Sequence, residues 1–111
     1  MKSSKQFLAA LTIGCVMCAP AALAGCNQPP APSKIPDGAT ASMAVMVTTM
    51  QTVKEYNNDV QTYLKCLDFE ARQNQISPDS QMSLHNSAVD QLKQVTAQFN
   101  DQVKIFKSKH S

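Results

Sequence analysis

The chain has 111 residues, and this length limits it to one small domain. It carries ten basic and eight acidic side chains and no tryptophan. Two of its lysines lie in a predicted signal peptide, and without them the formal charge falls from +2 to zero. A neutral mature chain lacks the basic surface on which nucleic-acid binding depends, so we expect no nucleic-acid partner.

Residues 1–24 are expected to be a signal peptide. Lys2 and Lys5 precede an apolar segment at residues 7–16, and the sequence ALA at residues 22–24 is a small-residue cleavage site. The apolar segment is shorter than the roughly 20 residues that a transmembrane helix needs. We therefore predict export from the cytoplasm, with loss of this segment from the mature protein.

Cys26 has two alternative fates. Cleavage of the signal peptide also removes Cys15 and Cys18, so Cys26 and Cys66 are the two cysteines of the mature chain. In an oxidising compartment such a pair can form a disulfide. The sequence LAGC at residues 23–26 is also a lipobox, which would place a lipid on Cys26 and anchor the protein in the outer membrane. We favour the soluble form with a disulfide, and the lipid-anchored form is the alternative. We expect contact with a membrane only if Cys26 carries this lipid.

A proline-rich arm is expected at residues 25–39. It holds four prolines, which favour an extended conformation, and the sequence DG at residues 37–38 indicates a turn at its end. Fifteen extended residues span about 46 Å at 3.1 Å each, whereas the helix from residue 42 to Cys66 spans about 36 Å at 1.5 Å per residue. The arm is therefore long enough to fold back along the first helix and bring Cys26 to Cys66.

Two helices are predicted, at about residues 41–75 and 78–108, within a helical hairpin of residues 40–111. Apolar residues recur at steps of three and four along both segments, which is the pattern of an amphipathic helix. Ser77 and Pro78 are typical of a helix start, and the short link before them favours antiparallel neighbours. We predict an all-α fold, and two copies can complete a four-helix bundle. The first apolar stripe is Met43, Met46, Met50, Val53, Val60, Leu64, Leu67 and Ala71. The second is Met82, His85, Val89 or Ala88, Leu92, Val95, Phe99, Val103 and Phe106.

Short motifs are spread over most of the mature chain. They are Cys26 before the proline-rich arm, IPDG at residues 35–38, YLKCL at 63–67, HN at 85–86 and FN at 99–100. Together they resemble a set of small exported proteins of Gram-negative bacteria that have no established activity. The resemblance implies that the chain is exported to the periplasm of such a bacterium. The two cysteines recur as a pair in that set, so the resemblance implies a disulfide between them. Here the first cysteine also lies in a lipobox, which keeps the lipid anchor open.

A methionine-rich set is the candidate for metal binding. Thioether and imidazole ligands suit Cu(I), and the first helix carries Met43, Met46 and Met50 while the second carries Met82 and His85. Methionines at helical spacing also fill hydrophobic cores, and this is the interpretation we favour. His85 is then expected to be partly buried with a structural role, and no metal or other cofactor is expected.

Four aromatic residues, Tyr56, Tyr63, Phe99 and Phe106, flank the apolar stripes or lie in them. They can form an interaction face or complete the two-helix core, and the core is the more common outcome. The sequence holds no close pair of carboxylates, no Ser-His-Asp set, no phosphate loop and no zinc spacing, so we predict that the protein is not an enzyme. We expect a small cell-envelope protein, structural or protein-binding, whose partner is another envelope protein or a second copy. The alternative is a periplasmic copper-binding protein that uses the methionine stripe and His85.

Overall fold

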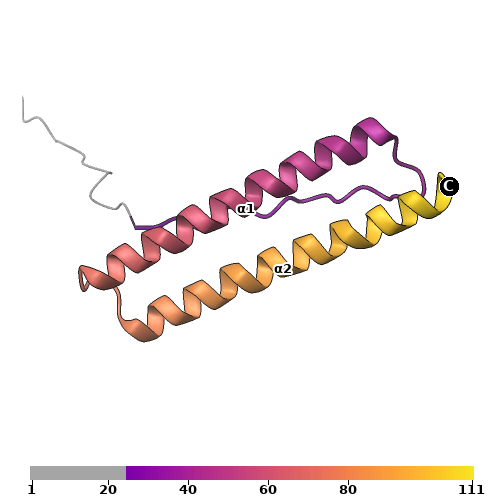
Figure 1. Cartoon of the computed structure of the whole chain (residues 1–111). Helices are drawn as coiled ribbons and strands as arrows, with labels where there is room; N and C mark the ends of the chain where they lie inside the picture. The colour runs from indigo at the N-terminus through magenta and orange to yellow at the C-terminus, as the bar shows by residue number, and fades with distance from the viewer. Residues whose placement is uncertain (1–24) are drawn as a thin grey trace, which may run out of the picture.

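The computed structural model describes residues 25–111, so the predicted signal peptide lies outside the described residues. Two helices, α1 at Met43–Arg72 and α2 at Pro78–Lys109, run antiparallel and pack side by side (Figure 1). No strand occurs in the described part of the chain. The predicted all-α helical hairpin is confirmed.

A serine side chain caps the start of each helix. The Ser42 hydroxyl accepts a hydrogen bond from the Val45 amide at 3.2 Å, which makes Ser42 the N-cap of α1. Ser77 caps α2 in the same way, through the Ser80 amide at 3.1 Å, and Pro78 follows as the first helical residue. These side chains satisfy amides that have no partner within the helix, so they fix where each helix starts.

α1 ends at Arg72, whereas the periodicity predicts an end near residue 75. Asn74 has a positive φ of 57°, which takes the chain out of the helix. Its amide donates to the Ala71 carbonyl at 3.1 Å, and the Gln75 amide donates to the Glu70 carbonyl at 2.8 Å. This pair of hydrogen bonds is a Schellman motif, which satisfies the last carbonyls of α1 and turns the chain toward α2.

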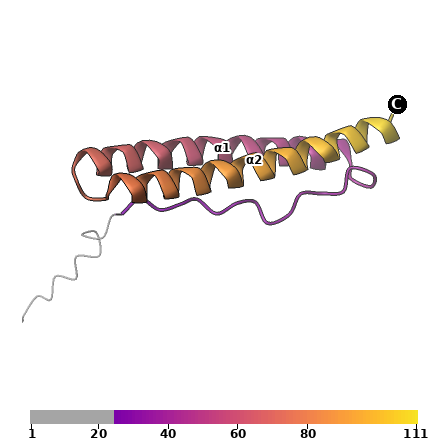
Figure 2. The same ribbon diagram turned by 90° about the horizontal axis from the view of Figure 1, so that it is seen from below.

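The proline-rich arm lies extended along one face of the hairpin (Figure 2). It runs from Cys26, near the link between the helices, to a turn in which the Asp37 carbonyl accepts from the Ala41 amide at 2.9 Å. The arm contacts α2 as well as α1, because the Gly38 amide donates to Gln102 Oε1 at 2.8 Å. We call the end of the hairpin that holds the link the turn end, and the other end, where α1 begins and α2 ends, the open end.

The hydrophobic core lies where the two helices and the arm meet. Along α1 its centre is a row of residues that recur every seven positions. A second buried row lies beside it on the side of the arm, where Tyr63 lines a hollow together with Pro29. Ala31 and Ile35 of the arm also pack against the core. The rows of α1 are Met46, Val53, Val60 and Leu67, and Tyr56, Tyr63 and Glu70; α2 contributes Ala88, Val95, Phe99 and Phe106.

This core is rotated toward the arm relative to the predicted stripe. The periodicity places Met43, Met50, Leu64 and Ala71 in the stripe, but Met43 and Met50 are 63% and 38% exposed, and the other two are half-buried. The arm covers the opposite flank of α1 and buries the tyrosines there, which adds apolar contact that two helices alone do not supply. We call the covered side of the hairpin the arm face and the opposite side the free face.

Candidate functional site

A disulfide fastens the arm to α1. Cys26 and Cys66 are paired, with their Cα atoms 5.8 Å apart and a separation of 40 residues in the sequence. The predicted disulfide is therefore confirmed, and the arm folds back along the hairpin as its length allows. Because one sulfur atom cannot hold both Cys66 and a lipid, the paired form and the lipid-anchored form exclude each other.

Glu70 completes this site, although no motif in the sequence singled it out. Its side chain is 8% exposed, and its Oε1 accepts a hydrogen bond from the Cys26 amide at 3.1 Å. The spacing from Cys66 is a signal that could have found it, since residues four apart lie on the same face of a helix. Burial raises the pKa of Tyr63, and the Glu70 charge raises it further. Glu70 thus positions the end of the arm beside the disulfide.

Three potential metal ligands meet at the same place. The sulfur atoms of Cys26 and Cys66 and a carboxylate oxygen of Glu70 lie within 4.8 Å of one another. Thiolates, rather than disulfide sulfurs, are the strong ligands of Zn²⁺ and related ions. In the paired state the two sulfurs are bonded to each other, so these residues act as a covalent clamp and not as a metal centre.

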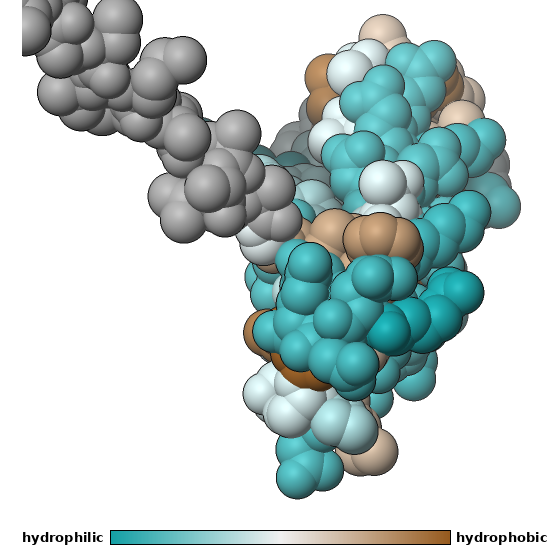
Figure 3. Space-filling view, turned by 90° about the vertical axis from the view of Figure 1, so that its left-hand side faces the viewer, coloured by the Kyte–Doolittle hydropathy of each residue, from teal (hydrophilic) through white to brown (hydrophobic). Residues whose placement is uncertain are grey.

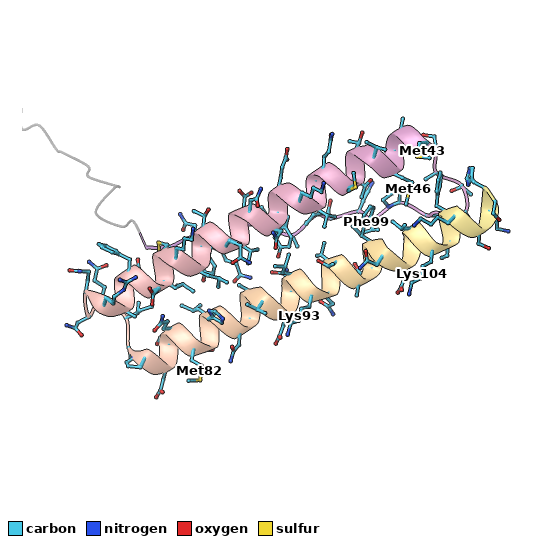
Figure 4. The ribbon with its side chains drawn as sticks, viewed as in Figure 1. Met43, Met46, Met82, Lys93, Phe99 and Lys104 are labelled. Atoms are coloured by element: carbon cyan, nitrogen blue, oxygen red, sulfur yellow. A yellow bond between two sulfur atoms is a disulfide. The ribbon has the colours of Figure 1, made fainter. Side chains whose placement is uncertain are left out.

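The five residues of the copper hypothesis do not come together in one site. Met43 and Met46 lie at the open end of the hairpin, and Met82 lies at the turn end (Figure 4). His85 is one turn after Met82, and it is exposed rather than partly buried as predicted. The buried residues of α2 begin only at Ala88, so the first turns of this helix extend beyond the core. The methionines of α1 are separated from Met82 of α2 because the helices run antiparallel, which puts the starts of the two helices at opposite ends of the hairpin.

An apolar groove of about 230 Å³ lies between the helices at the open end. All of its lining side chains are apolar except that of Lys107, and none of them belongs to the described part of the arm. The groove is therefore a feature of the free face. Its lining consists of Met43, Met46, Val47 and Met50 of α1 and Phe99, Val103, Phe106 and Lys107 of α2.

The free face carries one row of side chains from each helix, with members seven residues apart. Residues at this spacing share one side of a helix, and Met50 and Val103, one from each row, both line the groove. The rows are mostly apolar, and all of their members are exposed or half-buried. The row of α1 is Met43, Met50, Asn57, Leu64 and Ala71. The row of α2 is Met82, Val89, Thr96 and Val103, and His110, the residue after the helix, continues it.

The four aromatic residues considered as an interaction face belong to the core instead. Tyr56, Tyr63, Phe99 and Phe106 are between 4% and 8% exposed. The Tyr56 hydroxyl is buried without a hydrogen-bond partner among the described residues, and burial raises its pKa. Phe106 stacks on His110 with ring centroids 4.0 Å apart. Of the four, only Phe99 and Phe106 contribute to the groove, where they form part of its lining.

Seen from the turn end, the molecule is mostly hydrophilic, with apolar side chains in a few places (Figure 3). Within residues 25–111, neither helix has a stretch that is both long and apolar enough to cross a membrane. No family model, curated protein or solved structure matches the chain. The functional proposal therefore depends on the geometry of the arm, the disulfide and the free face.

Proposed function

We propose that this is an exported, non-enzymatic protein of the cell envelope that binds another protein through its free face. The observation that carries the proposal is the difference between the two faces of the hairpin. The arm covers one face, while the other keeps an open apolar groove whose lining includes Met43 at 63% exposure and Val47 at 41%. Other exposed apolar side chains, such as Phe69 at 57%, lie outside this groove. An exposed apolar patch with polar residues around it is typical of a protein–protein interface.

The disulfide supports this function because it makes a small domain rigid. It closes a loop of 40 residues, which the chain-entropy model values at about 4 kcal/mol of stability. A preformed surface loses less conformational freedom on binding than a flexible one does. Disulfides persist in oxidising compartments such as the periplasm. Lipidation would use the Cys26 sulfur that is bonded to Cys66, so a soluble protein fits the paired cysteines better than a lipid-anchored one.

The groove at the open end suits an apolar anchor of the partner. Methionine side chains adapt to the shape of what they contact, and grooves of this kind accept the apolar face of a helix. Lys107 is the charged residue in the lining. A partner that carries acidic groups beside its apolar anchor would therefore be favoured over one with basic groups.

Photo-crosslinking in the native envelope tests the proposal. A photoreactive amino acid at position 50 lies on the free face, whereas one at position 58 is also exposed but is turned about 100° from the row that contains Asn57. We expect an adduct with a protein from position 50 and none from position 58. Equal adducts from both positions, or none from position 50, would contradict binding through the free face.

Copper binding is the second candidate, because Met43, Met46 and Met50 line one groove. Three thioethers can hold Cu(I) without a contribution from α2. Titration of the mature protein with Cu(I) tests this candidate. Stoichiometric binding that disappears when all three methionines are replaced by leucine would support it, and an absence of stoichiometric binding would exclude it.

A further inference from the structure

The free-face row of α1 is symmetric about Asn57, which lies at the middle of this helix. Met50 and Met43 precede it by 7 and 14 residues, and Leu64 and Ala71 follow it by 7 and 14 residues. The row therefore reads apolar, apolar, polar, apolar, apolar in both directions along the helix. A pattern that is the same in both directions can match a second copy that runs the opposite way.

The row of α2 has a polar residue at the same level. Met50 and Val103 line the groove together, and the next members of their rows toward the turn end are Asn57 and Thr96. The two polar residues therefore lie side by side in the middle of the free face. Val89 and Val103 flank Thr96 at equal spacing, so the three central members of this row share the symmetry of α1, whereas the outer members, Met82 and His110, differ in polarity.

A two-fold axis through this point brings complementary residues of two copies together. Met50 then lies opposite Leu64 of the second copy and Met43 opposite its Ala71, so a long side chain meets a shorter one at each level. Asn57 meets Asn57 of the second copy, and a side-chain amide can both donate to and accept from an identical amide. A single asparagine in an apolar helical interface fixes register and the number of helices.

The charges of the chain agree with this antiparallel arrangement. The half near the open end, residues 34–57 and 94–111, has five basic and three acidic side chains and a net charge of +2. The half near the turn end, residues 58–93, has three basic and five acidic side chains and a net charge of −2. An antiparallel dimer sets each positive half against a negative one, whereas a parallel dimer sets like charges together.

We infer that the free face binds a second copy of this chain, in an antiparallel two-fold dimer with Asn57 at the axis. The inference rests on the proposed function and names its partner. The four helices then form a bundle whose core continues through both copies. The two arms lie on the outside of the bundle, so the disulfides and the dimer interface do not compete for the same surface.

Cysteine cross-linking of the folded mature protein tests the axis. Asn57→Cys should form a covalent dimer on mild oxidation, because residues at the axis lie within disulfide reach. Met50→Cys alone should not, since its two copies lie about 21 Å apart, seven residues at 1.5 Å on each side of the axis. A mixture of Met50→Cys and Leu64→Cys chains should give the mixed dimer. Asn58→Cys, one residue away from the axis, is the control and should stay monomeric on a non-reducing gel.

Peptide mapping of each variant checks that the native Cys26–Cys66 disulfide is retained, so that misfolded chains are not counted. Efficient cross-linking of Met50→Cys with itself would show that the two copies of position 50 lie close together, in a parallel dimer or about another axis, and would overturn the inference. Equal cross-linking through positions 57 and 58 would overturn it as well, because the two copies would then not meet specifically through the free face.

Sedimentation equilibrium of the unaltered mature protein gives an independent test. We expect a dimer, and we expect Met50→Glu to weaken it about tenfold or more, because a carboxylate would be buried against Leu64 of the second copy. Asn58→Glu should leave the dimer unchanged. A monomer at about 100 μM, where a micromolar dimer is nearly saturated, would overturn the inference. If position 50 still forms adducts with a different protein in the envelope, the proposed function stands without the dimer; if it forms none, both are wrong.

Discussion

Removing the disulfide tests how much of the fold depends on the arm. In the double variant Cys26→Ser/Cys66→Ser the arm stays in the chain but is no longer fastened to α1. The bond closes a loop of 40 residues, for which chain entropy gives about 4 kcal/mol. The buried Glu70 carboxylate also loses the Cys26 amide as a fixed donor. Because 1 kcal/mol shifts the melting temperature of a domain of this size by about 4–8 °C, we expect a fall of roughly 15–30 °C.

Thermal and guanidinium unfolding, followed by circular dichroism, measures this loss. A reducing agent should bring the wild type to the stability of the double variant and leave the variant unchanged. Glu70→Gln is the matched control, since it keeps the disulfide and the shape of the side chain. It should lower the free energy of unfolding by only about 1 kcal/mol. A double variant that melts within a few degrees of the wild type would refute the reasoning, because the disulfide would then contribute little to the fold.

Three further predictions concern the arm contact and the buried tyrosines. Gly38→Ala should lower the free energy of unfolding by about 1–3 kcal/mol, because a Cβ would collide with the Gln102 carbonyl oxygen and lie 2.9 Å from the Phe106 backbone nitrogen. Gln102→Ala, which removes the hydrogen bond to the Gly38 amide, should lower it by about 1 kcal/mol in the same melting experiments. Tyr56→Phe should raise the free energy of unfolding by about 1 kcal/mol, since it removes a buried hydroxyl that has no partner among the described residues, and a loss of stability would contradict this. Above pH 10 the wild type should lose stability as the pH rises, because burial raises the pKa of Tyr56 and Tyr63 above the ordinary 10.0 and the unfolded chain therefore ionises first. Replacing both tyrosines by phenylalanine should flatten this dependence in pH-resolved melts, and an unchanged slope would count against it.

The hairpin itself could be predicted because it follows from local signals. Ser42 and Ser77 act within one turn of their helices, so their effect does not depend on distant contacts. The spacing of apolar residues identified both helices, and the short link made them antiparallel. The end of α1 was misplaced because it depends on Asn74 in a left-handed conformation, which asparagine permits but does not require.

The orientation of the core could not be predicted in this way. Whether Met50 or Tyr63 faces inward depends on which flank of α1 the arm covers. The arm is held by contacts between residues that are far apart in the sequence, 44 residues for Cys26 with Glu70 and 64 for Gly38 with Gln102. The periodicity within one helix carries no information about such contacts. The same periodicity therefore identified the helix but missed which side of it is free.

The five residues of the copper hypothesis do not form one site, and the reason is a different one. The ligands were chosen by their spacing along each helix separately, and within each helix the spacing does place them on one side. An antiparallel hairpin, however, holds Met43 and Met82 at opposite ends (Figure 4). The predicted topology already implied this separation, so the hypothesis could have been restricted to Met43, Met46 and Met50 from the sequence.

The state of Cys26 in the native host tests the account most directly, and an intact mass measures it. We predict a mature chain that starts at Gly25, with a mass two hydrogen atoms below that of the fully reduced chain and a return of both hydrogens on reduction. A chain that starts at Cys26 and carries the mass of a lipid would contradict the account. The arm would then be tied to a membrane, Cys66 would be without its partner, and the covered arm face would lose the bond that holds it closed.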